Sequence, residues 1–179
     1  EYLDWLKNQN TLRLAVGVPA PNSIPEYLVE IISRHFAVDL NPVAYKGSAP
    51  MLTDMLGNQI SACIASVPEL LEYQRAGFVR VLGVMGAHRQ VAISEAPTFS
   101  ELGLIGFEQL PYYGFFGSPS ISKESIASIE GVVESVLTDS STREKLASIG
   151  LDVKYRNAEQ FKAQVQSYTH LWKRLISQG

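Results

Sequence analysis

Three short apolar segments in the first part of the chain each lead into a serine that opens a helical pattern. The segments cover residues 12–18, 40–45 and 60–65, and the serines are Ser23, Ser48 and Ser66. A strand followed by a helix, repeated in this way, predicts an α/β fold with a mainly parallel sheet flanked by helices. The carboxyl ends of parallel strands lie at one edge of the sheet, so we expect the three helices to begin there.

The starts of these helices predict a site for a small anion. Ser23 and Ser66 each stand three residues before a glutamate, Glu26 and Glu69, which is the capping-box pattern. Ser48 opens the middle helix without such a glutamate. The first turn of a helix presents N–H groups that have no acceptor within the helix, together with the positive end of the helix dipole. Three such starts at one sheet edge suit a negatively charged ligand.

Candidate ligand-binding residues lie around these helix starts, with one tyrosine further along the chain. They are Asn22, Ser23, Tyr45, Lys46, Gly47, Ser48, Ala49, Ser66 and Tyr113. Lys46 either supplies charge to a carboxylate or is an ordinary solvated lysine of a turn. The three serine hydroxyls either contact the ligand or serve only as caps, and we favour the backbone N–H groups beside them as donors. Asn22 could equally shape an Asx turn, and Tyr113 could belong to a core strand.

Composition excludes several classes of function. The chain has 179 residues, 46% of them hydrophobic and 18% charged, with a net charge of −3. These values describe an ordinary globular polypeptide. No basic run stands out, so we expect no nucleic-acid partner. Cys63 is the only cysteine and lies in an apolar segment, so we interpret it as a buried, inert thiol.

The sequence shows no pattern that would support catalysis. His35, His88 and His170 are far apart and fit no metal-binding spacing, and neither a nucleophile elbow nor a dinucleotide motif is present. The capping glutamates already have a structural role. We therefore predict no catalytic residue, no metal site, no cofactor and no enzymatic activity.

The later part of the chain predicts further strands and helices. We expect strands at 78–84, 112–116 and 151–155, helices at 122–138 and 142–149, and a last helix capped by Asn157. Thr98 and Glu101 form another capping box. The tail beyond residue 117 has amphipathic helices but no sheet of its own, so its apolar faces need a partner.

A set of short motifs runs in order along residues 1–179. It comprises Tyr45-Lys46-Gly47-Ser48-Ala49-Pro50, residues 54–60, Ala76-Gly77, residues 81–84, His88-Arg89, Ala96-Pro97-Thr98, Glu101-Leu102-Gly103, Gly106-Phe107-Glu108, residues 113–116, residues 141–146 and the helix of Trp172. This ordered set resembles the Bug family, the periplasmic solute receptors of tripartite tricarboxylate transporters. One loop departs from the family pattern, because Pro19 and Pro21 stand where the family often has a small, Ser/Gly-rich turn.

The resemblance implies a two-lobed type II periplasmic-binding fold that closes on a carboxylate-bearing solute. In that architecture residues 1–10 are the end of a crossing helix from the first lobe, 11–117 are the second lobe, and 118–179 are the tail returning to an incomplete first lobe. The implied partners are a small carboxylate ligand and the membrane subunits of a transporter, and the implied location is the periplasm. The export signal and most of the first lobe are expected to lie outside this sequence.

Other interpretations remain open. The same fold serves as the effector domain of transcriptional regulators, which would require a helix-turn-helix segment upstream. An enzyme of the same architecture would need a catalytic constellation that we do not find. The tail helices could also pair with another copy of the chain and cause self-association. Because the donors of one lobe are missing, we predict that this segment binds carboxylates weakly or not at all.

Overall fold

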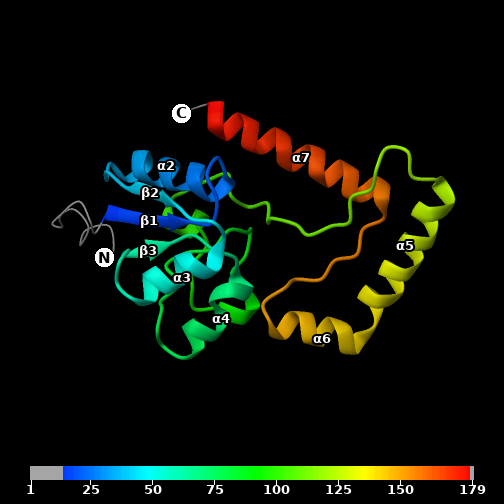
Figure 1. Cartoon of the computed structure of the whole chain (residues 1–179), viewed down its shortest axis with the longest axis horizontal. Coiled ribbons are helices and arrows are strands. Elements are labelled where there is room, and N and C mark those ends of the chain that lie inside the picture. Colours follow the sequence, from blue (N-terminus) through cyan, green and yellow to red (C-terminus); the bar gives the residue numbers. More distant parts are fainter. Residues whose placement is uncertain (1–13, 178–179) are drawn as a thin grey trace. The chain divides into compact units, whose positions relative to one another are not determined.

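The computed structural model describes residues 14–177 of the chain (Figure 1). Two compact units follow one another: the first extends to Val81 and the second begins at Leu82. The helix end predicted at 1–10 and the beginning of the first predicted strand lie outside the described residues. The lobe boundaries expected near residues 11 and 117 concern a whole receptor and stay a prediction.

The first unit is built on a three-stranded parallel sheet, which confirms the predicted fold class. The strands are β1 (Ala15–Val18), β2 (Asn41–Ala44) and β3 (Ala62–Cys63), in the spatial order β2-β1-β3. The helices that follow them in turn are α2 (Ile24–Phe36), α3 (Ser48–Leu56) and α4 (Val67–Arg75). Val18 pairs in register with Ala44, and Gly17 pairs with Cys63. The carboxyl ends of all three strands therefore lie at one edge of the sheet.

The side chains of β1 alternate between the two faces of the sheet and so divide the core of this unit in two. Val16 and Val18 pack with Val29 of α2. Ala15 packs on the opposite face with Met51 of α3. Figure 1 shows the same division, with α2 on one face of the sheet and with α3 and α4 on the other.

Gly17 lets α3 approach the sheet closely. A Cβ atom at this position would lie 2.6 Å from Cδ1 of Ile60 and 2.7 Å from Cγ of Met51, which is far inside contact distance. The Met51 side chain is fully buried. The missing side chain of Gly17 is thus filled by Met51, and this contact places the start of α3 at the carboxyl edge of the sheet.

The second unit contains α5 (Lys123–Thr138), α6 (Ser140–Ser148) and α7 (Ala158–Ser177), with short 3-10 turns at Val91–Ile93 and Ser100–Leu102. These helices agree with the predicted ones. Asn157 caps the last helix as expected, since its side-chain oxygen accepts the N–H of Gln160 at 2.9 Å. The predicted pair of Thr98 and Glu101 is also confirmed, because each side chain accepts the backbone N–H of the other residue.

Aromatic side chains join α7 to the irregular segment before α5. The ring of Tyr112 lies 5.3 Å from that of Tyr168, and the ring of Phe107 lies 6.0 Å from that of Trp172. Tyr168 and Trp172 are the buried residues of α7. The tail helices were expected to need a partner for their apolar faces, and for α7 the segment at 107–116 of this chain supplies it.

The apolar face of α5 differs from that of α7. None of its side chains is buried, and Ile129, Val132 and Val136 are exposed. The predicted self-association through exposed tail helices stays a prediction and now concerns this helix.

Three predicted strands were wrong. In the described structure, residues 78–84, 112–116 and 151–155 are irregular, apart from an isolated bridge between Val84 and Thr98. A strand needs a neighbouring strand for its backbone groups, and the backbone after α4 has other partners: the N–H of Phe78 donates to the carbonyl of Tyr73 at 2.9 Å. In the second of these segments, Tyr112 and Phe116 pack on Phe161 of α7 rather than within a sheet.

Truncation of Met51 tests whether α3 depends on the contact at Gly17. We expect Met51→Ala to lower the free energy of unfolding by about 2–5 kcal/mol, because it opens a cavity beneath α3. The matched control is Leu56→Ala on the same helix. Because this leucine is 37% exposed, we expect a much smaller decrease in the free energy of unfolding. Urea denaturation followed by circular dichroism measures both. Equal losses for the two variants would contradict this account of the core.

Candidate ligand-binding site

The three loops at the carboxyl edge of the sheet are joined to one another through backbone hydrogen bonds. The N–H of Tyr45 donates to the carbonyl of Val18 at 2.9 Å, and the N–H of Gly47 donates to the carbonyl of Pro19 at 2.8 Å. On the other side of β1, the N–H of Ile64 donates to the carbonyl of Gly17 at 2.9 Å. The starts of α2, α3 and α4 are therefore fixed relative to the end of β1.

The start of α2 differs from the capping box that the sequence predicts. Ser23 stands at the cap position, but its hydroxyl donates to the carbonyl of Ala20 at 2.6 Å and does not cap the helix. Glu26 instead accepts the backbone N–H of Asn22. Asn22 has a positive φ of 53°, a left-handed conformation that asparagine tolerates. This turn moves the donor that reaches Glu26 one residue upstream of the predicted position.

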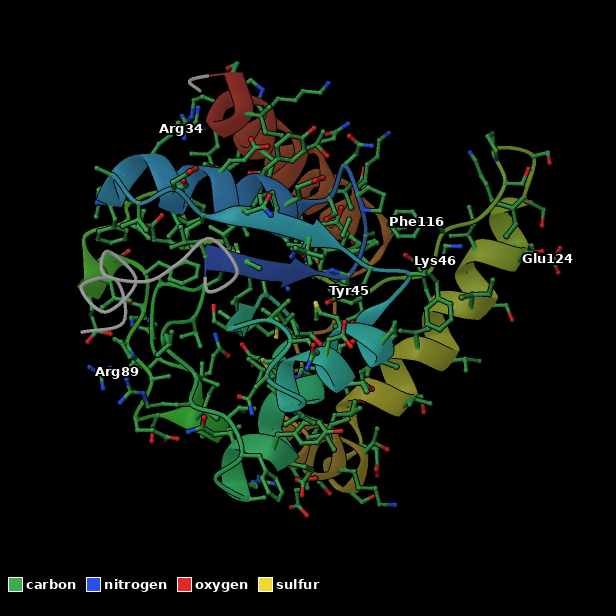
Figure 2. The ribbon with its side chains drawn as sticks, turned by 60° about the vertical axis from the view of Figure 1, so that its left-hand side comes forward. Arg34, Tyr45, Lys46, Arg89, Phe116 and Glu124 are labelled. Atoms are coloured by element: carbon green, nitrogen blue, oxygen red, sulfur yellow. The ribbon has the colours of Figure 1, made fainter. Side chains whose placement is uncertain are left out.

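The start of α3 is more open than the other two. The cap residue is Gly47 rather than Ser48, and its φ of 102° is a conformation that favours glycine. No atom lies within 4 Å of the place where a Cβ of Gly47 would stand. Lys46 is exposed just before it, and Figure 2 shows Tyr45 and Lys46 directly after the end of β2.

The first turn of α3 also carries no acidic residue, whereas α2 carries Glu26 and α4 carries Glu69 there. The N–H groups of Ser48 and Ala49 have no acceptor within the helix, because they belong to its first turn. Of these three helix starts, that of α3 is the one where a negative group would meet free N–H donors and no carboxylate in the same helical turn.

The start of α4 confirms the predicted capping box. The carboxylate of Glu69 accepts the backbone N–H of Ser66 at 2.9 Å and the Ser66 hydroxyl at 2.7 Å. Burial raises the pKa of Glu69, but hydrogen bonds from Ser48 and Ser66 outweigh this effect and hold the pKa below its ordinary value. Glu69 is therefore ionised at neutral pH, and its negative charge stands at the start of α4.

Two of the three serine hydroxyls at this edge already have protein partners. Ser23 donates to the carbonyl of Ala20 and Ser66 donates to Glu69. For these two serines, the structure favours the backbone N–H groups beside them, rather than the hydroxyls, as donors for an anion. Direct contact of any of the predicted residues with a ligand stays a prediction.

Tyr45 is held by α3. Its hydroxyl donates to Oδ2 of Asp54 at 2.8 Å. Burial, together with the hydrogen bond and the charge of Asp54, raises the pKa of Tyr45 to about 12. The proton of this hydroxyl is therefore directed at Asp54 and would be available to a ligand only if that bond broke. Tyr113 belongs to the second unit, where its side chain is 75% exposed, and its place in the site stays a prediction.

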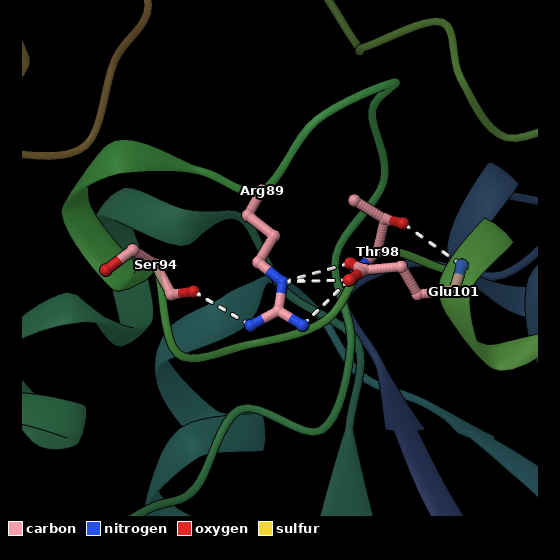
Figure 3. A network of polar contacts seen from close by, with 4 residues as sticks. All are labelled: Arg89, Ser94, Thr98 and Glu101. Carbon is pink, nitrogen blue, oxygen red and sulfur yellow. Dashed lines mark hydrogen bonds and ion pairs between the residues drawn. The ribbon is translucent and has the colours of Figure 1, made fainter.

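A network in the second unit that the sequence did not predict joins Arg89 to Glu101 (Figure 3). Nη2 of Arg89 donates to Oε1 of Glu101 at 2.7 Å, Nε donates to Oε2 at 3.0 Å, and Nη1 donates to the carbonyl of Ser94 at 3.3 Å. The Arg89 guanidinium and the N–H of Thr98 lower the pKa of Glu101 to about 2. Arg89 is neutralised by the chain's own carboxylate, so it closes a loop rather than offering a charge to a ligand.

Cys63 is half-buried rather than buried as predicted, but its surroundings still disfavour a thiolate. Its Sγ lies 3.2 Å from Sδ of Met55. Burial, with a smaller contribution from the charge of Glu69, raises the pKa of Cys63 to about 11. Among residues 14–177, no group of three or more His, Cys, Asp or Glu side chains could hold a metal ion. None of the described helices is long and apolar enough to cross a membrane.

Comparison with known proteins places the chain in a family. The sequence matches the profile of the tripartite tricarboxylate transporter family receptor along residues 1–179. The chain belongs to this receptor family. The resemblance to the Bug family is thereby confirmed, and a curated relative is BugT of Bordetella pertussis, which is 23% identical over 163 residues. That match covers 91% of this chain and 50% of BugT, so this receptor chain spans about half the length of the curated relatives it matches.

Solved structures confirm the fold of this receptor chain. Rpa4515 of R. palustris with adipate is 25% identical, with a TM-score of 0.87, over 98% of this chain and 58% of that protein. MatC from Rhodopseudomonas palustris with bound malate is 20% identical, with a TM-score of 0.83, over 98% of this chain and 60% of MatC. The periplasmic binding protein BugD is also similar: it is 20% identical, with a TM-score of 0.76, over 97% of this chain and 60% of BugD.

Acid titration tests the role of the Arg89–Glu101 pair. The folded pKa of Glu101, about 2, lies below its ordinary value of 4.5. The pair therefore contributes stability above pH 4.5, and this contribution is lost as the pH falls toward 2. We expect Glu101→Gln to have a lower melting temperature than the parent at pH 6, and the two curves to converge as the pH approaches 2. A constant difference between them across this range would contradict the assignment, and Glu144→Gln on α6 is the exposed control.

Thiol modification tests the environment of Cys63. At pH 7 we expect the folded chain to react with iodoacetamide roughly 100-fold more slowly than the urea-unfolded chain, because a pKa near 11 leaves far less thiolate. Mass spectrometry of timed samples measures the two rates. Equal rates would show that the thiol is neither shielded nor poorly ionised.

Proposed function

We propose that this chain is part of a periplasmic receptor that captures a small dicarboxylate between two lobes and delivers it to the membrane subunits of a transporter. The observation that carries the proposal is the start of α3, the helix start without an acid in its first turn, with Lys46 and Gly47 just before it. A carboxylate placed there would meet the N–H groups of Ser48 and Ala49, the helix dipole and the charge of Lys46.

Family membership and the neighbouring structures support the class of ligand. The profile that matches the chain describes a receptor. Two similar structures hold adipate and malate, which are both dicarboxylates. Such a receptor role involves no chemical step, and the receptor match gives no support to the alternative of a transcriptional regulator.

In the whole receptor, closure around the ligand depends on contacts that the ligand makes in the closed state and not in the open state. A ligand stabilises the closed state to the extent that it gains donors in that state which the open state does not present. The start of α3 supplies donors from one side only. The rest of the ligand's partners would come from the other lobe, which is why we expect this chain to bind dicarboxylates weakly.

Nuclear magnetic resonance titration of this chain with malate tests the proposal. We expect the amide signals of Gly47, Ser48 and Ala49 to shift, with a dissociation constant of about 1 mM or weaker. Lys46→Gln should weaken binding about two- to fivefold, because it removes an exposed charge near the carboxylate. Lys123→Gln in the second unit is the matched control and should leave the affinity unchanged.

Two results would contradict the proposal. One is an equal response to the uncharged diamide of malate, which would show that no anion is recognised. The other is a set of shifts that spares residues 47–49. A micromolar affinity would overturn the narrower expectation that donors from a second lobe are needed.

A further inference from the structure

The side chain of Tyr45 is bonded to the far end of the helix that follows it. Its hydroxyl donates to Oδ2 of Asp54 at 2.8 Å, nine positions further along the chain. Asp54 lies in the last turn of α3, which runs from Ser48 to Leu56. Tyr45 also packs on the apolar cluster that contains Met51 of the same helix. The hydrogen bond therefore spans the start of α3, where the proposed function places the donors for a ligand.

The turn between Tyr45 and α3 has little packing of its own. Lys46 is exposed (Figure 2), and no atom lies within 4 Å of the place where a Cβ of Gly47 would stand. The φ of Gly47 is 102°, so the chain changes direction at a residue that has no side chain. The N–H groups of Tyr45 and Gly47 donate to the carbonyls of Val18 and Pro19. These two bonds anchor the turn to β1, whereas the bond between Tyr45 and Asp54 anchors it to α3.

The bond to Asp54 is of the stronger kind, because the acceptor is a carboxylate. Hydrogen bonds to an ionised group are shorter and roughly twice as strong as those between neutral groups. Asp54 is also held in place, since its backbone carbonyl accepts the N–H of Gln59 at 2.8 Å. The side chain of Tyr45 is thus fixed by an acceptor that belongs to the helix itself.

We propose that Asp54 is a positioning residue of the ligand site: its carboxylate holds Tyr45 and thereby fixes the turn of Lys46 and Gly47 relative to α3. The inference rests on the proposed function, which places the ligand carboxylate at this turn. Asp54 acts through Tyr45 and does not touch the ligand. Because the proton of the Tyr45 hydroxyl is used in this bond, Tyr45 serves the site by fixing the turn rather than as a donor to the ligand.

Three variants separate positioning from direct contact between Tyr45 and the ligand. Asp54→Ala and Tyr45→Phe each remove the bond, and Tyr45→Phe retains the aromatic ring. Asp54→Asn removes the charge but retains an oxygen that can accept from the Tyr45 hydroxyl. The controls are Asp39→Ala, at an exposed acid before β2, and Tyr73→Phe, at a tyrosine of α4 that packs on the same apolar cluster.

In the absence of ligand, we expect Asp54→Ala to shift the amide signals of Lys46 and Gly47, which lie at least seven positions away along the chain. Asp54→Asn should leave these signals close to those of the parent chain, and neither control should move them. With malate, Asp54→Ala and Tyr45→Phe should each bind about fivefold more weakly. The double variant should bind no more weakly than either, because both changes remove the same interaction. Asp54→Asn should stay within about twofold of the parent affinity.

Two results would overturn the inference. If Asp54→Ala lowered the melting temperature but left the amide signals of Lys46 and Gly47 and the malate affinity at the parent values, the bond would only stabilise the fold. If Tyr45→Phe weakened malate binding while Asp54→Ala did not, the Tyr45 hydroxyl itself would be the donor to the ligand.

The ligand-free spectra separate this inference from the proposed function. If malate bound to none of these chains, the proposed function would fail. Shifted amide signals in Asp54→Ala would still support the positioning of the turn, and unchanged signals would refute it independently of malate.

Discussion

The parallel pairing of β1 with β2 and β3 is the constraint on which the rest of the candidate site depends. Because the register aligns Val18 with Ala44 and Gly17 with Cys63, the three strands end at the same edge. Each following helix must then begin at that edge, with its N–H groups and positive dipole end exposed there. The contact of Met51 with Gly17 keeps α3 against the sheet, so the open start of this helix has a well-defined place.

The distribution of carboxylates at this edge gives the three helix starts different properties. Glu26 and Glu69 accept hydrogen bonds at the starts of α2 and α4, so these two starts carry negative charge supplied by the chain itself. The start of α3 has Lys46 and no acid in its first turn. In the second unit a carboxylate is likewise paired within the chain: Glu101 neutralises the charge of Arg89, and this ion pair closes a loop. Pairing within the chain thus accounts for the charges of Glu26, Glu69, Arg89 and Glu101, whereas Lys46 stays a candidate for the ligand.

Local spacing made part of this structure predictable. The capping pairs Ser66–Glu69, Thr98–Glu101 and Asn157–Gln160 join residues three positions apart, so the helical turn itself brings them together. The failure at Ser23 has a local cause as well, because the left-handed Asn22 places a different N–H beside Glu26. The predicted strand at 78–84 failed for a tertiary reason: apolar character alone does not supply a neighbouring strand, and the backbone found partners on α4 instead.

The sequence by itself determined the repeated strand and helix order, the parallel sheet, and the receptor family, because these depend on periodicity, cap residues and an ordered set of motifs. Only the tertiary structure decided which polar groups remain for a ligand. Tyr45 is directed at Asp54 and Arg89 at Glu101, across separations that no local spacing rule covers. Hydrogen bonds of this kind form only after packing has brought distant turns together, so the partners of these side chains are a property of the folded chain.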